Sequence, residues 1–148
     1  MSNRRTVLFV DDEVRLLRAL ERGLVREPYD KLFAESGEQA LALLAEHEVH
    51  VIVTDMRMPE MSGLDLLRIV KQRYPHIVRI VLSGYTQVTT LLTAINQGEI
   101  YRFITKPWNM ENDFKPSIQQ ALEHHDLQAK GDVPYVESAV SNPEPGND

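Results

Sequence analysis

The sequence predicts an α/β protein built on a parallel β-sheet. Between Thr6 and about Gln128, five short apolar runs alternate with longer stretches in which apolar residues recur at helical spacing. This alternation is typical of βαβ units, whose strands run parallel in one sheet. The strands are expected at residues 6–10, 31–34, 51–54, 77–82 and 100–104.

The character of three runs predicts their place in the sheet. Residues 6–10 and 51–54 are apolar at successive positions, as expected for central strands that helices cover on both faces. The last run, residues 100–104, is interrupted by Arg102. We therefore expect this last strand at an edge of the sheet.

The stretches between the runs carry stripes of apolar residues at steps of three and four, which predict helices that pack on the sheet. The stripes are Val14, Leu17, Leu20 and Leu24; Ala40, Leu41 and Leu44; Leu64, Leu67 and Val70; and Phe114, Ile118, Ala121, Leu122 and His125. Asn109 is a candidate N-cap for the last helix, where Pro116 is tolerated only in about the first turn.

Composition and charge narrow the class of protein. After Lys130 the sequence becomes Pro-rich and acidic, so we expect one domain over residues 1–128 and a linker or disordered tail over residues 129–148. The formal net charge of −6 and the pI near 5.4 argue against nucleic-acid binding by this domain, because affinity for the phosphate backbone comes from clustered Lys and Arg.

Two absences exclude further classes. Because the chain has no cysteine, it can form no disulfide, thiolate nucleophile or cysteine-based metal site. Its apolar runs are too short to cross a bilayer, and the N-terminus lacks the apolar stretch of a signal peptide. We expect a cytoplasmic protein without a membrane partner.

The residues that follow the strands carry the chemistry. In an open parallel sheet, functional groups gather at the carboxyl ends of the strands. Asp11 and Asp12 follow the first strand, Asp55 the third, Ser83 the fourth and Lys106 the fifth. At an effective dielectric of about 20, two carboxylates roughly 5 Å apart repel by about 3 kcal/mol, so this acidic group predicts a cation. Oxygen ligands favour Mg²⁺, for which Mn²⁺ can substitute.

The same residues suit phosphoryl chemistry. A carboxylate can attack phosphorus and form an acyl phosphate if the incoming negative charge is neutralised. The cation, Lys106 and the Ser83 hydroxyl can supply this neutralisation. Taken singly, each residue has an ordinary explanation as a helix cap, a turn residue or a solvated surface charge. Their joint occurrence at the strand ends of one sheet favours the functional interpretation.

Four motifs, in order and at matching spacing, resemble the response regulator receiver family over about residues 6–128. They are Val10-Asp11-Asp12-Glu13; Thr54-Asp55-Met56-Arg57-Met58-Pro59 followed by Ser62-Gly63; Leu82-Ser83-Gly84; and Lys106-Pro107-Trp108. The resemblance implies a doubly wound, flavodoxin-like three-layer sandwich with strand order 2-1-3-4-5. It also implies a switch of two-component signalling, which catalyses only its own phosphotransfer and autodephosphorylation.

The resemblance assigns roles within the expected site. Asp55 is the phosphoacceptor, served by a histidine kinase, a phosphotransfer protein or a small phosphodonor. Mg²⁺ is held by Asp12, Asp55 and the backbone carbonyl of Arg57, and Asp11 binds it mainly through water. Lys106 contacts the phosphoryl group. In this family, the peptide bond that matches the one between Lys106 and Pro107 is commonly cis.

Switching and output are implied by the same resemblance. Ser83 is expected to move toward phosphorylated Asp55, and Phe103 to turn into the vacated space; Phe103 has no hydroxyl, so any signal that needs an aromatic O–H is absent. An output domain, a partner protein or a second copy in a phosphorylation-dependent homodimer would bind to one face of the domain. The residues of that face can equally be interpreted as ordinary half-exposed surface residues. That face comprises Leu91, Gln97, Tyr101, Arg102 and Trp108.

Two flanking positions and one longer stretch extend the resemblance. Arg57 and Tyr85 flank the pocket, and we expect them to alter the lifetime of the acyl phosphate. Residues 94–108 are similar to the same stretch of receivers that are joined to cyclic-dinucleotide phosphodiesterases or comparable output enzymes. We recognise no such output enzyme within the 148 residues.

Two alternatives stay open. One is a receiver-like binding module that works without phosphorylation, although the acceptor, the acid pair and the lysine are all present. The other is a Mg²⁺-dependent phosphohydrolase with an aspartyl-phosphate intermediate. Such enzymes place the nucleophile after the first strand with a second Asp two positions on, whereas Asp11 is followed at that distance by Glu13.

Overall fold

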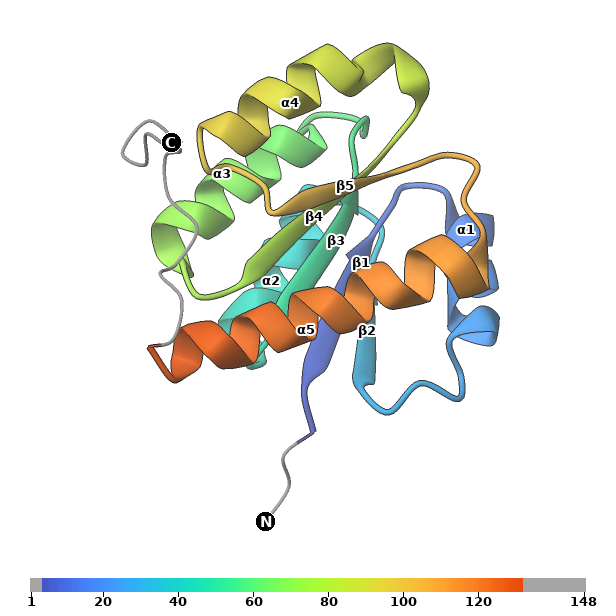
Figure 1. Cartoon of the computed structure of the whole chain (residues 1–148). Coiled ribbons are helices and arrows are strands. Elements are labelled where there is room, and N and C mark those ends of the chain that lie inside the picture. The colour runs from blue at the N-terminus through green and yellow to red at the C-terminus, as the bar shows by residue number, and fades with distance from the viewer. Residues whose placement is uncertain (1–3, 132–148) are drawn as a thin grey trace.

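The computed structural model describes residues 4–131, apart from the side chain of Tyr85, and this part of the chain forms a five-stranded parallel sheet. The strands lie in the order β2-β1-β3-β4-β5, which confirms the predicted fold, the two central strands and the edge position of the last one (Figure 1). Their bounds are β1 Thr6–Val10, β2 Asp30–Ala34, β3 Val51–Asp55, β4 Val78–Ser83 and β5 Arg102–Thr105.

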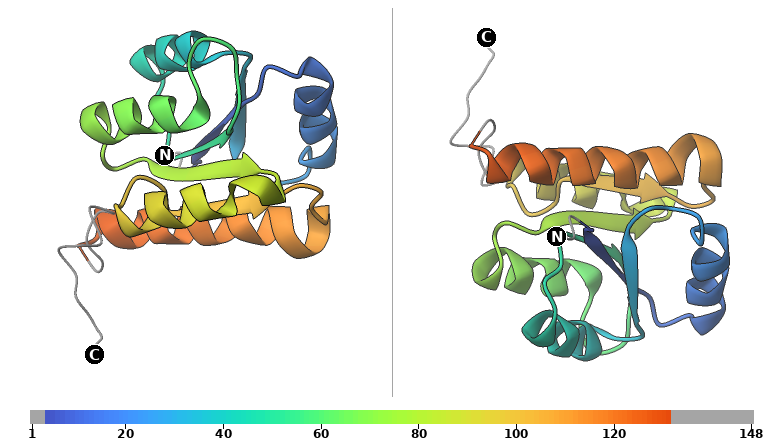
Figure 2. Two further views of the ribbon diagram at one scale, coloured as in Figure 1. Left: turned by 90° about the horizontal axis from the view of Figure 1, so that it is seen from above. Right: turned by 90° about the horizontal axis from the view of Figure 1, so that it is seen from below.

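Helices cover both faces of the sheet, as the run of successive apolar residues in its central strands requires. α1 and α5 pack on one face, and α2, α3 and α4 pack on the other. Figure 2 shows α2 and α3 lying together on the opposite side from α5. Their bounds are α1 Val14–Gly23, α2 Gly37–Glu46, α3 Gly63–Arg73, α4 Val88–Asn96 and α5 Lys115–Ala129. Tyr85–Gln87 forms a 3₁₀ turn before α4, and Met110–Phe114 forms a π-helical turn before α5.

The core consists of two apolar clusters, one on each face, and β1 contributes to both. Val7 and Phe9 belong to the cluster under α1 and α5, whereas Leu8 and Val10 belong to the cluster under α2, α3 and α4. This division follows from the alternation of side chains along a strand. One residue of the predicted stripes is exposed: Val14 is 40% exposed, because α1 begins there, ahead of the residues that pack on the sheet. Leu41 and His125 are partly buried, and the other stripe residues are buried.

Local signals define where the last helix begins. Asn109 is the N-cap of the π-helical turn that leads into α5, and its side chain accepts a hydrogen bond from the Asn112 amide at 2.7 Å. Pro116 lies in the first turn of α5, where a missing amide proton costs nothing. Both expectations for this helix are confirmed, with the π-helical turn as an addition.

A buried charge lies in β4. Arg79 is 1% exposed, and its guanidinium donates to the carbonyls of Ile77, Gly98 and Glu99 at 3.0–3.2 Å. These bonds hold the turn between α4 and β5 against the sheet. β5 starts after this turn at Arg102, two residues later than expected.

The amino end of the sheet carries a group of histidines. The rings of His50 and His125 lie 4.8 Å apart in an edge-to-face arrangement, and the His76 ring lies 6.2 Å from that of His125. The Thr6 amide donates to His50 Nδ1 at 3.0 Å. Burial lowers the pKa of both His50 and His125, so both are neutral near pH 7.

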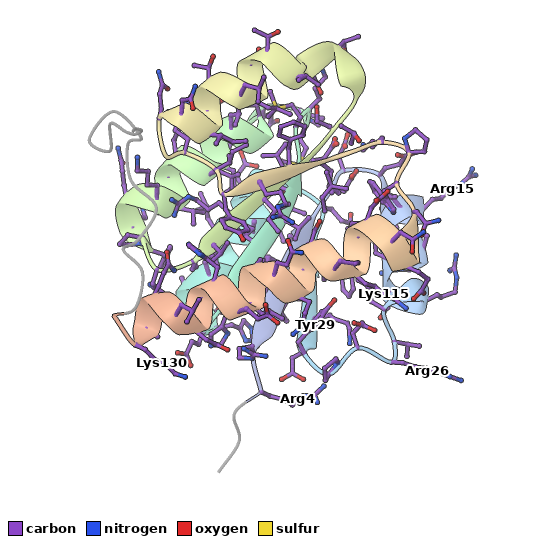
Figure 3. All side chains as sticks on the ribbon, in the orientation of Figure 1. Arg4, Arg15, Arg26, Tyr29, Lys115 and Lys130 are labelled. Carbon is purple, nitrogen blue, oxygen red and sulfur yellow. The ribbon has the colours of Figure 1, made fainter. Side chains whose placement is uncertain are left out.

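Several basic side chains lie on the surface of the molecule. The basic side chains of Arg15, Arg26 and Lys130 point outward at separate places and do not form one patch (Figure 3). No helix within residues 4–131 combines the length and the apolar character that crossing a membrane requires. α5 ends at Ala129, just beyond the predicted domain boundary; residues 132–148 of the predicted linker or tail lie outside the described residues.

Candidate functional site

The register of the sheet brings the strand-end residues to one edge. Val10 of β1 is level with Thr54 of β3, so Asp11 and Asp55 end neighbouring strands. Ser83 of β4 is level with Thr105 of β5, and the Lys106 amide extends this ladder by donating to the Ser83 carbonyl at 2.7 Å. Four of the five strands thus contribute to the carboxyl edge, where ligands bind in open α/β sheets.

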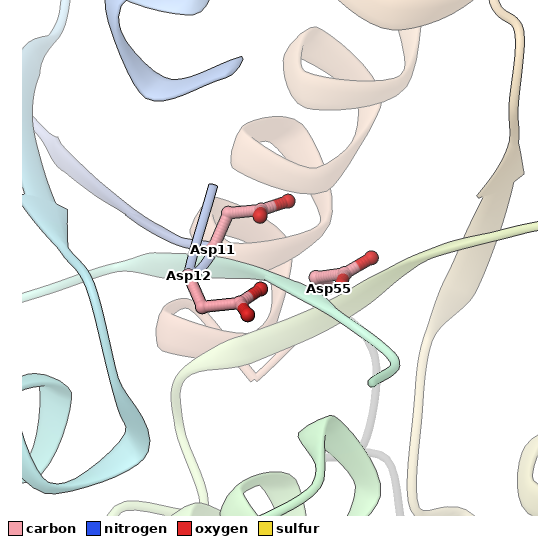
Figure 4. A group of neighbouring side chains, drawn as sticks. All are labelled: Asp11, Asp12 and Asp55. Carbon is pink, nitrogen blue, oxygen red and sulfur yellow. The ribbon is translucent and has the colours of Figure 1, made fainter. Parts of the chain in front are cut away.

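The three predicted acids form a cluster. Asp11, Asp12 and Asp55 each offer a carboxylate oxygen, and these oxygens all lie within 4.8 Å of one another. Figure 4 shows the side chains of Asp11 and Asp12 extending from the end of β1 toward the side where Asp55 lies. Asp11 is 1% and Asp55 9% exposed, whereas Asp12 is exposed to solvent. Two of the three charges are therefore poorly hydrated.

Only one of the two carboxylate oxygens of Asp11 has a hydrogen-bond partner in the described structure. Its Oδ1 accepts a hydrogen bond from the Glu13 amide at 2.8 Å, but its buried Oδ2 has no hydrogen-bond partner within the described structure. Burial raises the pKa of Asp11 to about 6, the Glu13 amide opposes this rise, and the nearby Asp55 charge adds to it. A buried, unpaired carboxylate oxygen is costly unless a cation or donor meets it. The residues present therefore fit a divalent cation.

Lys106 places a positive charge beside Asp55. Its Nζ lies 2.8 Å from Asp55 Oδ1, and the Lys106–Pro107 peptide bond is cis, as expected. Burial lowers the pKa of Lys106, but the hydrogen bond to Asp55 and the charges of Asp55 and Asp11 more than offset this effect, so the net pKa is raised. Lys106 is consequently charged throughout the physiological range.

The backbone beneath Asp55 is fixed by Gly63. The Gly63 amide donates to the Met56 carbonyl at 2.8 Å, and a Cβ at position 63 would lie 2.1 Å from the Asp55 carbonyl oxygen. Ser62 caps the helix that starts there, since its Oγ accepts from the Asp65 amide at 3.1 Å. The Ser62-Gly63 motif alone did not predict this close approach, because the distance between α3 and the end of β3 cannot be derived from the spacing of residues in the sequence.

The two residues expected to switch, Ser83 and Phe103, are buried or partly buried, and Ser83 has one contact that the sequence did not predict. Ser83 is 1% exposed, and its Oγ donates to Gln87 Oε1 at 2.8 Å and lies 2.9 Å from the Gly84 carbonyl. Phe103 is partly buried and packs against the core cluster under α2, α3 and α4. Gln87 was missed because only the 3₁₀ turn brings it back onto Ser83.

The residues expected on an output face differ in how far they are exposed. Leu91 is a correction: it is fully buried, because it faces the sheet from α4. Trp108 packs toward α5, with its ring centroid 5.0 Å from that of Phe114. Gln97 is exposed, whereas Tyr101 and Arg102 are partly buried. Arg57 is exposed, and the side chain of Tyr85 lies outside the description.

The comparison with protein families decides the identity of the domain. The family model of the response regulator receiver domain matches residues 7–115. The chain belongs to the response regulator receiver family. The match spans the acid pair, Asp55, Ser83 and Lys106, so the receiver domain includes the whole carboxyl edge of the sheet.

Curated relatives of this receiver domain are transcriptional regulators of greater length. The hydrogenase transcriptional regulatory protein HoxA of Cupriavidus necator is 42% identical over 123 residues, which cover 83% of this chain and 25% of that protein. The DNA-binding transcriptional regulator NtrC of Salmonella typhimurium is 30% identical over 125 residues, or 84% of this chain and 26% of that protein. The chain spans about a quarter of the length of these relatives.

Solved structures agree with the fold of the receiver domain. The signal receiver domain of an HD domain-containing protein from Pseudomonas fluorescens is 36% identical, with a TM-score of 0.80 over 88% of this chain and 95% of that one. The response regulator TrrA of Thermotoga maritima, solved with Mg²⁺-BeF, is 24% identical, with a TM-score of 0.70 over 80% of this chain and 99% of that one. The latter likeness concerns the fold alone.

Proposed function

We propose that this receiver domain is a phosphorylation switch of a two-component system, in which Asp55 accepts a phosphoryl group from a histidine kinase, a phosphotransfer protein or a small phosphodonor. The observation that carries the proposal is the combination, at one edge, of three clustered carboxylates with an ammonium 2.8 Å from Asp55. A structural salt bridge would need only one of these acids. The cluster as a whole supports a site for a cation and a phosphoryl group.

Mg²⁺ is the cofactor that this donor set suits best, and Mn²⁺ can substitute. Asp12, Asp55 and the Arg57 backbone carbonyl would hold it, with Asp11 contributing mainly through water. Bound there, Mg²⁺ would supply positive charge against the acids and the incoming phosphoryl oxygens. The unpartnered Oδ2 of Asp11 supports this assignment. TrrA, which shares the fold, was solved with Mg²⁺-BeF.

The residues of the chain divide the phosphotransfer between them. An Asp55 oxygen attacks phosphorus; the new P–O bond forms as the P–N or P–O bond of the donor breaks, and the donor keeps the electron pair. Lys106, already beside Asp55 Oδ1, neutralises the charge that arrives on this side. Ser83 then donates its hydroxyl proton to a phosphoryl oxygen, and Phe103 turns inward.

Output depends on what the switch contacts. Gln97, Tyr101, Arg102 and Trp108 remain candidates for the face that meets an output domain, a partner protein or a second phosphorylated copy. Because HoxA and NtrC are transcriptional regulators of which this chain matches about a quarter, we include an output domain in the proposal. Arg57 and Tyr85 would adjust the lifetime of the acyl phosphate.

Labelling with acetyl phosphate and Mg²⁺, followed by intact-mass measurement, tests the proposal. We expect wild type to gain one phosphoryl group and Asp55→Asn to gain none. Asp65→Asn, an exposed acid in the first turn of α3, serves as a matched control that should still be labelled. An unlabelled wild type would instead favour the phosphorylation-independent module. Turnover of many phosphomonoesters would favour the hydrolase.

A further inference from the structure

The Ser83 hydroxyl has a single proton and is already engaged. Its Oγ lies 2.8 Å from Gln87 Oε1 and 2.9 Å from the Gly84 carbonyl, both of which are acceptors. Because Ser83 is 1% exposed, water does not compete for this proton. A serine hydroxyl donates one hydrogen bond at a time. Any phosphoryl oxygen that receives the Ser83 proton must therefore displace these acceptors.

Gln87 occupies a position from which this contact has a structural effect. It ends the 3₁₀ turn Tyr85–Gln87 and is the N-cap residue of α4, yet its side chain makes no cap hydrogen bond to that helix. The side chain instead reaches back four residues to the end of β4. The Ser83–Gln87 bond thus closes the loop between β4 and α4.

We propose that Gln87 is a positioning residue that acts as a latch, holding the Ser83 hydroxyl away from Asp55 until the site is phosphorylated. The latch rests on the proposed function, since it opposes the movement of Ser83 toward a phosphoryl group. Opening it also releases the start of α4 from the end of β4. The contact with Gln87 adds to the contact with the Gly84 carbonyl in stabilising the resting state of the switch, and activation must break it.

The expected change in affinity for a phosphoryl analogue can be derived from the net contribution of one neutral hydrogen bond to the free energy. Such a bond shifts an equilibrium constant by roughly two- to tenfold. Removing the Gln87 acceptor should raise the affinity for a phosphoryl analogue by about this factor. The natural probe is beryllofluoride with excess Mg²⁺, and the reporter is the fluorescence of Trp108, the only tryptophan of the chain, two residues after Lys106.

The experiment compares Gln87→Leu with wild type as the full 148-residue chain. Gln87→Leu should bind beryllofluoride roughly two- to tenfold more tightly. Gln87→Asn, whose side chain is one methylene too short to reach Ser83, should behave in the same way and is a second variant if the leucine disturbs folding. Gln72→Leu, the same substitution at an exposed position of α3, should bind as wild type does.

A double-mutant cycle separates a latch from a merely structural tie. In a Ser83→Ala background, Gln87→Leu should no longer change the affinity, because no hydroxyl is left to release. Hydrogen exchange of residues 84–91 without ligand should be faster in Gln87→Leu than in wild type. Unchanged affinity of both Gln87 variants, or an equal gain in the Ser83→Ala background, overturns the latch. A wild type that neither binds beryllofluoride nor is labelled on Asp55 overturns the proposed function instead.

Discussion

Replacing Gly63 by alanine should damage the fold and the site together. The new Cβ would lie 2.1 Å from the Asp55 carbonyl oxygen and 3.1 Å from the Met56 Cα. Real Cβ atoms do not approach within 3.0 Å of such an atom, so the start of α3 and the end of β3 must separate by about 0.9 Å. Overpacking of this kind lowers the unfolding free energy by about 1–3 kcal/mol, and straining the hydrogen bond from the Gly63 amide to the Met56 carbonyl lowers it by about 1 kcal/mol more. The better helix propensity of alanine returns less than about 1 kcal/mol.

We therefore expect Gly63→Ala to lose about 2 kcal/mol of unfolding free energy, measured by urea denaturation without Mg²⁺. Two other glycines provide a graded series. A Cβ at Gly84 meets nothing within 4 Å, so Gly84→Ala should unfold as wild type does; a Cβ at Gly37 meets only the flexible Met61 side chain, so its cost should be intermediate. Beryllofluoride affinity should fall in Gly63→Ala alone, because only there does the backbone of Asp55 move. Equal stability of Gly63→Ala and Gly84→Ala would refute the reasoning.

Three further predictions follow from charges. Lys106→Met removes the ammonium beside Asp55, so acetyl phosphate labelling should slow at least tenfold by intact mass, while Mg²⁺ should bind more tightly by fluorescence titration because a like charge is gone. The lowered pKa values of His50 and His125 mean that unfolding takes up protons; their stabilising effect is complete above about pH 6.5 and is lost as the pH falls below it. Urea midpoints should thus drop less between pH 7.5 and 5.5 in His125→Gln than in wild type, and equal drops would contradict this. Arg79→Met strands buried carbonyls and should cost about 3 kcal/mol in the same assay, whereas a wild-type midpoint would show that the bonds matter little.

The sequence was sufficient for the fold because its strongest signals are periodic. Successive apolar residues in β1 and β3 indicated strands covered on both faces, and Arg102 marked the edge strand. The acids, Ser83 and Lys106 were identifiable for a related reason. Parallel strands bring their carboxyl ends to one edge, so residues distant in sequence could be placed together without coordinates.

Contacts that depend on turns and side-chain conformation could not be predicted. Leu91 looked like a surface residue until the orientation of α4 turned it toward the sheet. Arg79 was expected only as part of a strand, and its burial depends on carbonyls supplied by two separate turns. Gln87 required the 3₁₀ turn before α4. Each of these features is non-periodic, so no pattern in the sequence indicates it.

The two edge strands have a consequence for behaviour at high concentration. An unpaired strand edge can recruit the edge of another molecule and begin aggregation, which a charged side chain on the edge discourages. β2 carries Lys31, whose Nζ donates to the carbonyls of Glu27 and Tyr29, and β5 begins with Arg102, which pairs with Gln120 across the edge. Each of the two edge strands therefore carries a positively charged side chain. Intermolecular strand pairing is thereby disfavoured, even when many copies crowd together.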